Sequence, residues 1–259
     1  MEFFDSHAHY NDEKFDDDRN EILCKIQEAG IKKVIVAGYD IQSSRKAVEI
    51  ANENSWIYAT CGISPNDVVC GMKDAINQIK DIAKTSKKVV AIGEIGLDYY
   101  WNKENKEMQK DYFREQIKLA NELELPIVIH SRDAYIDTIG VLKEIPCEKK
   151  GVFHCCQFNI ELVKEAINLG FYISFAGPVT FKNAKNSQEV IKYVPLNKIF
   201  IETDSPYLAP EPVRGTRNDS RNVIYIAKKI AEIKEITLAE VEKATYENPK
   251  KLFNINNES

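Results

Sequence analysis

Two of the chain's four histidines lie two residues apart near its start, in the stretch FFDSHAHY. Residues two apart on a β-strand point to the same face of the sheet, so His7 and His9 would direct two imidazoles at one point. Converging neutral imidazoles are typical of metal binding. An isolated His-x-His also occurs at the solvated end of an ordinary strand, so the assignment depends on the rest of the chain.

The other histidines and several carboxylates also lie at the ends of apolar runs. His130 follows the run in PIVIHSRDA, and His154 follows the run in GVFHCC. Glu94 interrupts the apolar segment AIGEIGLDYY, while Glu202 and Asp204 end the run in IFIETDSPYLAP. Each of these residues alone has an ordinary structural explanation. All four histidines at the same end of predicted strands indicate a metal site.

The number of candidate ligands predicts the type of site. Four imidazoles and at least two carboxylates exceed the three protein ligands of a catalytic zinc. We therefore expect two divalent ions that share a carboxylate, and Glu94 is the natural bridge because its strand lies between the two histidine groups. Mixed nitrogen and oxygen ligation favours Zn, Mn, Co or Fe over Mg, which remains the less preferred candidate. Two ions activate water for hydrolysis, and Asp204 is placed to take the proton.

The elements that must position these residues form a repeating pattern. Eight β-rich apolar runs are each followed by polar loop residues and then a helical pattern; the runs are Glu2–Ser6, Lys33–Gly38, Ile57–Ile63, Val89–Leu97, Pro126–Ser131, Gly151–Cys155, Phe171–Gly177 and Lys198–Thr203. Eight such units predict a single-domain (β/α)8 TIM barrel over residues 1–259, with the active site at the carboxyl ends of the strands. A doubly wound open sheet is the alternative, but the first run is not followed by a glycine-rich phosphate turn.

Helix signals separate these runs. The acidic run Asp16–Asp18 predicts a first turn of a helix that Gly30 ends, and Lys103–Glu124 carries the longest apolar stripe. Thr237 with Glu240 predicts a capping box for one more helix near the end of the chain.

Composition narrows the class of protein. A chain of 259 residues with 44% hydrophobic residues can bury a large core. Its net charge of -5 argues against a protein that coats duplex DNA, but not against a nuclease that takes one strand end into a small metal site. The six cysteines show no metal or disulfide spacing, which predicts free thiols and a cytoplasmic location. No apolar run is long enough for a membrane span, Met1-Glu2 leaves no room for a signal peptide, and no obligate protein partner is evident.

The motifs resemble the TatD family of metal-dependent deoxyribonucleases, within the amidohydrolase superfamily. The matching stretches run through nearly the whole chain: FFDSHAH, AIGEIGLDYY, LPIVIHSRDA, GVFHC, GFYISFAGPVTFKNAK, IFIETDSPYLAPEPVRGTRN and NPKKLF. The resemblance implies that one metal is held by His7, His9, Glu94 and Asp204, and the second by Glu94, His130 and His154. It also implies that Asp204 is the base and that the substrate is DNA, trimmed at single-stranded ends by phosphodiester hydrolysis.

Two stretches depart from the family pattern. Where the family reads Gly-x-His-Pro-His, this chain reads GISPND, so Ser64 and Asn66 replace both histidines. The loop after the sixth strand reads HCCQFN instead of His-Cys-Phe-Ser-Gly. In the Gly-x-His-Pro-His pattern, the resemblance associates the first histidine, at the position of Ser64, with the scissile phosphate. A serine can donate a hydrogen bond to that phosphate but carries no charge. The predicted metal set is complete, whereas the substrate contacts are altered.

Several other residues are candidates for supporting roles. Arg132 and Ser64 are candidate phosphate contacts, because guanidinium and hydroxyl groups suit phosphate oxygens. Asp5 and Glu202 are candidates for orienting a metal-bound imidazole. The aromatic residues Tyr99–Trp101 fit either base stacking or barrel packing.

Two other functions stay open at this stage. The first is hydrolysis of a small ester, lactone or amide by the same fold, which the acidic pI and the Ser64 and Asn66 replacements favour. The second is a non-catalytic metal-binding or nucleic-acid-binding protein. The presence of Asp204 beside a complete ligand set argues against the second, because an idle site needs no base.

Overall fold

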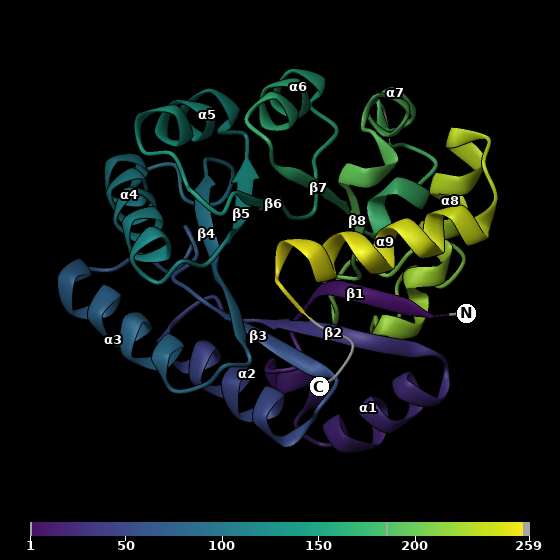
Figure 1. Cartoon of the computed structure of the whole chain (residues 1–259), viewed down its shortest axis with the longest axis horizontal. Coiled ribbons are helices and arrows are strands. Elements are labelled where there is room, and N and C mark those ends of the chain that lie inside the picture. Colours follow the sequence, from purple (N-terminus) through teal and green to yellow (C-terminus); the bar gives the residue numbers. More distant parts are fainter. Residues whose placement is uncertain (1, 185, 256–259) are drawn as a thin grey trace.

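The computed structural model describes residues 2–184 and 186–255 and shows a parallel eight-stranded sheet in which each strand pairs with the next along the chain. The sheet curls into a nearly closed barrel (Figure 1). Its strands are β1 (Phe3–Ala8), β2 (Ile31–Ala37), β3 (Ile57–Cys61), β4 (Val89–Asp98), β5 (Ile127–Arg132), β6 (Gly151–Phe153), β7 (Tyr172–Phe175) and β8 (Ile199–Ile201). The predicted (β/α)8 barrel is confirmed, and the open doubly wound sheet is excluded.

Helices alternate with the strands and surround the sheet (Figure 1). They are α1 (Arg19–Glu28), α2 (Ile41–Glu53), α3 (Met72–Lys84), α4 (Lys106–Glu122), α5 (Tyr135–Glu144), α6 (Ile160–Asn168), α7 (Ser187–Tyr193), α8 (Val223–Lys234) and α9 (Leu238–Leu252), with short 3-10 turns η1 (Glu13–Phe15), η2 (Gly177–Thr180), η3 (Leu196–Lys198) and η4 (Ser220–Asn222). Helix α9 begins with the expected capping box: the side chain of Thr237 accepts the backbone N–H of Glu240, and the side chain of Glu240 accepts the backbone N–H of Thr237.

The apolar core has two layers, as barrel packing requires. One layer fills the interior of the barrel with side chains from every strand: Phe4, Ile35, Tyr58, Val90, Ala91, Val128, Val152, Tyr172 and Phe200. Residues at the carboxyl end of α9 complete this layer, since Phe253 stacks edge-on against Phe200. The larger layer lies between the strands and the surrounding helices. Because α9 covers one end of the barrel, a site with access to substrate must lie at the other.

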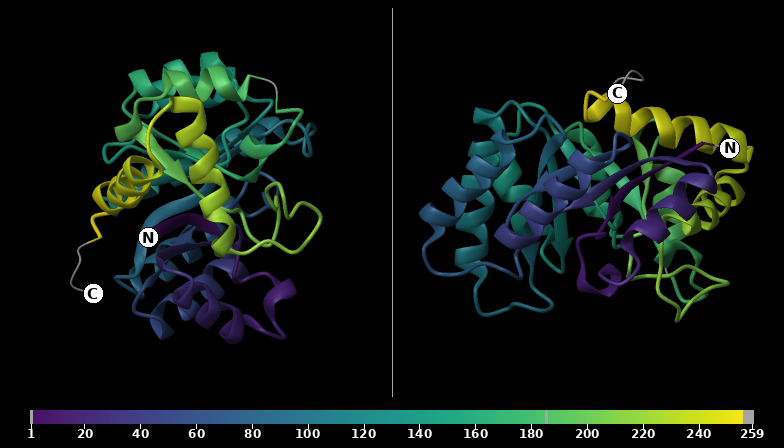
Figure 2. Two further views of the ribbon diagram at one scale, coloured as in Figure 1. Left: turned by 90° about the vertical axis from the view of Figure 1, so that its right-hand side faces the viewer. Right: turned by 90° about the horizontal axis from the view of Figure 1, so that it is seen from below.

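Figure 2 shows this polarity in both views: α9, in yellow, lies at one end of the barrel, and the long light-green segment between β8 and α8 lies at the opposite end. That opposite end holds the carboxyl termini of the strands, where the histidines and carboxylates were predicted to gather.

The first and last strands meet at a seam held by individual hydrogen bonds. In the described residues, β1 and β8 form no ladder of their own. Instead, the hydroxyl of Ser6 donates to the carbonyl of Ile201 at 3.0 Å, and the N–H of Asp204 donates to the carbonyl of His7 at 3.0 Å. The N–H of His9 donates to the carbonyl of Ser205 at 2.6 Å. The seam therefore places the first histidine pair beside Asp204.

Asp5 stabilises this seam through hydrogen bonds to residues that follow β8. Its buried carboxylate accepts the N–H of Thr203 at 2.9 Å, the hydroxyl of Thr203 at 2.5 Å and the hydroxyl of Ser220 at 2.6 Å. Burial outweighs these bonds and raises the pKa of Asp5 to about 7. The strand-end aspartate thus connects β1 to the residues that follow β8.

We expect Asp5→Ala to lower the free energy of unfolding by about 3 kcal/mol, because it leaves buried N–H and hydroxyl donors without an acceptor. Urea denaturation followed by circular dichroism measures the change. Asp17→Ala is the matched control, since Asp17 is exposed and its loss should stay within about 0.5 kcal/mol. Equal stability of the two variants would show that Asp5 does not hold the seam.

Two local predictions were wrong. The first strand was expected to end at Ser6, but β1 continues through His7 to Ala8 because its polar residues find partners across the seam. The aspartates before α1 were expected in its first turn, but the helix begins at Arg19 and Asp18 is its cap residue, without a side-chain capping bond.

All six cysteines are free, as expected. None of the helices in the described part of the chain is long and apolar enough to cross a membrane.

Candidate metal centre

The six residues predicted to bind metal come together at the carboxyl end of the barrel. His7 lies near the end of β1 and His9 just after it, while Glu94 and His130 lie within β4 and β5. The remaining two, His154 and Asp204, follow the ends of β6 and β8. Three groups of side chains there could hold an ion, namely His7–His9–Asp204, Glu94–His130–His154 and His7–His154–Glu202, with the candidate ligand atoms of each group within 4.8 Å of one another.

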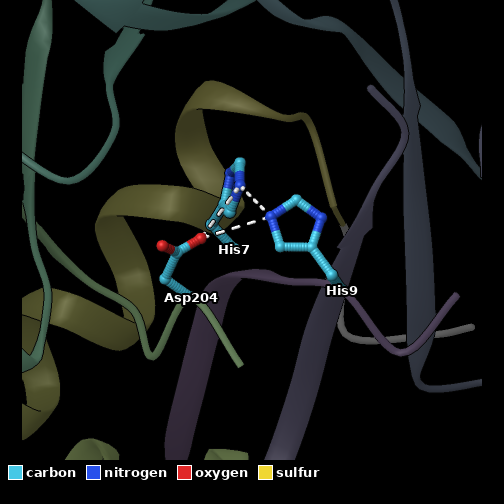
Figure 3. Close-up of side chains that lie close together, drawn as sticks. All are labelled: His7, His9 and Asp204. Atoms are coloured by element: carbon cyan, nitrogen blue, oxygen red, sulfur yellow. Dashed lines mark hydrogen bonds and ion pairs between the residues drawn. The ribbon is translucent and has the colours of Figure 1, made fainter. Parts of the chain in front are cut away.

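The first group forms across the seam. The Nε2 atoms of His7 and His9 lie 3.2 Å apart, and Oδ1 of Asp204 lies 3.2 Å from Nε2 of His9 and 3.7 Å from Nε2 of His7 (Figure 3). The three polar atoms point toward a common position. The Nδ1 atom of His9 faces the carbonyl of Ala37 at 3.2 Å, which leaves Nε2 as the free ligand atom. Nδ1 of His7 is buried without a hydrogen-bond partner in the described part of the chain, so its ring is not held as an ordinary structural histidine.

The second group lies on the other side of Glu94. The Oε1 atom of Glu94 is 2.9 Å from Nδ1 of His130 and 3.2 Å from Nε2 of His154. These two histidine nitrogens are themselves 3.1 Å apart. Its Oε2 atom is 3.4 Å from Nε2 of His7, in the first group. One carboxylate therefore faces each group with a different oxygen, which is the geometry expected of a bridging ligand.

The two central carboxylates are ionised at neutral pH. Burial alone would raise the pKa of Glu94, but the charge of His154 and hydrogen bonds from three histidines hold it well below its usual range. Burial likewise opposes the shift at Asp204, where the bond to His9 and the neighbouring histidine charges lower the pKa to about 2. Two buried anions among converging imidazoles provide the mixed oxygen and nitrogen donors that a divalent cation takes. The residues present therefore fit the metal-binding role.

Comparison with known proteins gives the family. The profile of TatD-related DNases matches residues 4–254. The chain belongs to this family. The Bacillus subtilis protein named as the uncharacterized metal-dependent hydrolase YabD is 44% identical over 98% of this chain and 99% of its own length. YcfH of Escherichia coli K12, named in the same way, is 33% identical over 98% of this chain and 97% of its own length. The crystal structure of YjjV, a TatD homolog from Escherichia coli K12, superposes with a TM-score of 0.93 at 27% identity, covering 98% of each chain. The protein is thus a metal-dependent hydrolase of the TatD family.

Of the two carboxylates expected to orient imidazoles in this TatD-family protein, one is placed to do so. Oε1 of Glu202 accepts the N–H of Cys155 at 2.6 Å and faces Nδ1 of His154 at 3.5 Å; that nitrogen has no hydrogen-bond partner in the described residues, so Glu202 holds the backbone beside the ring and lies next to the ring itself. Asp5 touches the backbone N–H of His7 at 3.4 Å, and its other bonds run to Thr203 and Ser220. Asp5 therefore stabilises the seam between β1 and the residues after β8, and within the described residues it makes no hydrogen bond to the imidazole of His7.

The structure adds Asp98, which sequence reasoning missed. Its Oδ2 atom lies 2.9 Å from Nε2 of His130, on the side of the ring opposite Glu94. Its Oδ1 atom accepts the N–H groups of Tyr100 at 2.9 Å and Trp101 at 2.8 Å. Burial would raise its pKa, but the bonds from His130 and Trp101 lower it to about 2. A carboxylate behind a metal-binding histidine fixes the tautomer and the direction of the ring.

Asp98→Asn tests this role, because asparagine keeps an oxygen for the Tyr100 and Trp101 N–H groups but presents an NH2 group to His130. We expect metal affinity to fall about 10- to 100-fold, as measured by titration calorimetry on metal-stripped protein. Asp81→Asn, on the exposed face of α3, should bind like the wild type. An unchanged affinity in Asp98→Asn would mean that His130 needs no orienting partner.

The two expected phosphate contacts differ in their surroundings. Arg132, at the end of β5, is half-buried and makes no ion pair or side-chain hydrogen bond within residues 2–184 and 186–255, so its N–H groups are available. The hydroxyl of Ser64 donates to Asp67 at 2.5 Å and accepts the N–H of Asn66 at 3.2 Å. A phosphate contact by Ser64 would require an exchange of the bond to Asp67. Asn66, which replaces the second family histidine, donates to Asp98 at 3.4 Å.

Proposed function

We propose that the protein hydrolyses phosphodiester bonds with two divalent metal ions and trims single-stranded DNA ends as a deoxyribonuclease. His7, His9, Glu94 and Asp204 would hold one ion, and Glu94, His130 and His154 would hold the other. Zn, Mn, Co and Mg are the candidate ions. Bound ions would supply activation of water and stabilisation of the anionic phosphorus centre.

The position of Glu94 carries this proposal. Its Oε1 atom faces His130 and His154, in the second group, and its Oε2 atom faces His7, in the first. The division of its two oxygens between two histidine groups supports two adjacent ions that share a ligand.

Asp204 is the group we assign as general base. Its side chain is 16% exposed, compared with 1% for His7 and 9% for His9, so of this group it is the one most open to water. Its low pKa keeps it ionised, and its Oδ1 atom lies among the candidate ligand atoms, 3.2 Å from Nε2 of His9. A positioned carboxylate of this kind accepts the proton of the attacking water, and Arg132 would contact the scissile phosphate.

A second candidate is hydrolysis of a small ester, lactone or amide, which the acidic surroundings on one side of the site favour. Tyr39 and Tyr207, whose rings lie edge-on to His9, also line a pocket of about 790 Å³. The charged residues of that pocket are mostly acidic: Asp12, Glu13, Asp16, Asp40 and Glu49, against Arg45 and Lys46. A DNA strand would avoid this side and approach over Arg132.

Reloading metal-stripped protein with Mg, Mn, Co or Zn tests the proposal. Each form is incubated with single-stranded, duplex and 3′-blocked oligonucleotides, and the products are sized by gel electrophoresis. Metal-dependent shortening of single strands from an unblocked end is the expected result. Two bound equivalents of metal with no cleavage under any ion would discard DNA and favour a small carbonyl substrate, to be sought with ester, lactone and amide panels.

The expected location and partners form part of the same proposal. DNA, as single-stranded ends, is the partner, with no membrane and no obligate protein partner, and the six free cysteines agree with the reducing cytoplasm.

A further inference from the structure

Three side chains next to His130 form what we call the aromatic–arginine platform: Tyr100, Trp101 and Arg132. The Arg132 guanidinium lies 4.0 Å from the centre of the Tyr100 ring and 5.5 Å from that of Trp101. The two aromatic rings meet edge to face, with centres 4.7 Å apart and an angle of 90° between their planes. The platform thus combines two ring surfaces with a cation.

The platform adjoins the metal centre through shared bonds. Asp98 contacts His130 with one oxygen and fixes the backbone of Tyr100 and Trp101 with the other. Arg132 lies opposite Asp98 in the pairing of β4 with β5, two residues beyond His130. A molecule that lies on the platform therefore has its neighbouring groups beside the candidate ligands.

Folding does not account for these exposed rings. Trp101 is 69% exposed and Tyr100 is 47% exposed, so neither ring belongs to the core. The loop is held by other bonds: Asp98 binds its backbone, Gln109 donates to the carbonyls of Asp98 and Asn102, and Asn102 donates to the carbonyl of Pro65. The indole is presented from a backbone that is already ordered, which lowers the entropy cost of binding.

We propose that Trp101 stacks on an unpaired base of the terminal nucleotide while Arg132 contacts a phosphate of the same strand. An exposed indole face suits any base, and guanidinium N–H groups suit phosphate oxygens. A terminal base within a duplex is held in place by its complement and offers only its outer face, whereas an unpaired terminal base can turn onto the indole, so the platform favours unpaired ends. This inference rests on the proposed phosphodiesterase activity and names the residues that make it specific for single strands.

Kinetics on matched substrates test the stacking. One oligodeoxythymidylate carries a base on the terminal nucleotide, and the other carries an abasic tetrahydrofuran at that position. We expect the wild type to prefer the base-bearing strand by about 5- to 150-fold in kcat/KM. W101A should bring the ratio toward one, and W101F should retain most of it. Tyr193→Ala removes a 43% exposed ring on α7 and should retain the wild-type ratio. A wild-type ratio near one, or a ratio in W101A equal to the wild type, would overturn the inference.

Fluorescence separates this inference from the proposed function. The chain has two tryptophans, so W56F leaves Trp101 as the single emitter. Stacking predicts that a phosphorothioate oligodeoxythymidylate quenches the emission of Trp101 and that its fully abasic counterpart quenches it little. If W56F does not fold, the emission of Trp101 is obtained as the difference between the wild type and W101F. Quenching without cleavage would support the platform and overturn the hydrolysis of DNA. Cleavage without quenching would support the hydrolysis and overturn the platform.

Discussion

Asp204→Asn is expected to lower kcat on the cleaved oligonucleotide by about 10²- to 10⁴-fold, the usual effect of removing a general base. Asparagine has nearly the same shape and keeps one oxygen toward His9, so we expect the variant to retain bound metal when metal is saturating. The rate is measured under single-turnover conditions, and the metal content by inductively coupled plasma mass spectrometry on the same sample.

Asp133→Asn is the matched control for this change. Asp133 is exposed, follows β5 at the same end of the barrel, and has a backbone φ of 54° that asparagine also tolerates. The control should cleave at the wild-type rate. A normal rate in Asp204→Asn would remove Asp204 from the chemistry and favour a protein that binds metal or nucleic acid without hydrolysis.

Glu94→Gln is expected to reduce the bound metal from two equivalents to one or fewer and to abolish measurable cleavage. Its two oxygens face different histidine groups, so the loss of its charge and of one oxygen weakens both positions. Changing a residue behind a ligand already costs about 10- to 100-fold in affinity, and a shared ligand should cost at least as much. Equilibrium dialysis against Mn or Co measures the stoichiometry.

Glu104→Gln provides the comparison, since Glu104 is an exposed residue in the loop between β4 and α4 and has no contact with the candidate ligands. It should bind two equivalents of metal. If Glu94→Gln also bound two, the bridging assignment would be wrong, and each group would have to hold its ion without the shared carboxylate.

The barrel could be predicted from sequence because buried parallel strands are short apolar runs and helices separate them at regular intervals. The end of β1 could not, since the run Glu2–Ser6 was expected to stop at its polar residues Asp5 and Ser6. Their burial depends on partners such as Thr203 and Ile201, which lie far along the chain. Sequence shows how polar a residue is, but not which distant group satisfies it.

In the candidate site, too, some residues could be predicted from the local sequence pattern and others depend on contacts with distant parts of the chain. The histidines and Glu94 could be predicted because a charged or imidazole group at the end of an apolar run is unusual, and the structure brings all of them together. Asp98 was missed because it directly follows the predicted run Val89–Leu97 and reads as the start of a loop, whereas β4 extends to include it. The pairing of β4 with β5, which sets Asp98 against Arg132 and Gly96 against His130, is the signal that would have located it. Ser64 could not be assessed from sequence, because its bond to Asp67 depends on the conformation of the loop.

The seam between β1 and β8 also sets the order of events when the protein is made. The bond between His9 and Asp204 joins residues 195 positions apart, so the two histidines leave the ribosome long before their carboxylate partner is synthesised. At typical rates of translation that interval is about 10 to 40 s. The second histidine group has all its residues once His154 is made, whereas the first group cannot form until Asp204 follows. The nascent chain therefore acquires its full metal-binding site only near the end of synthesis, when the last strand docks beside the first.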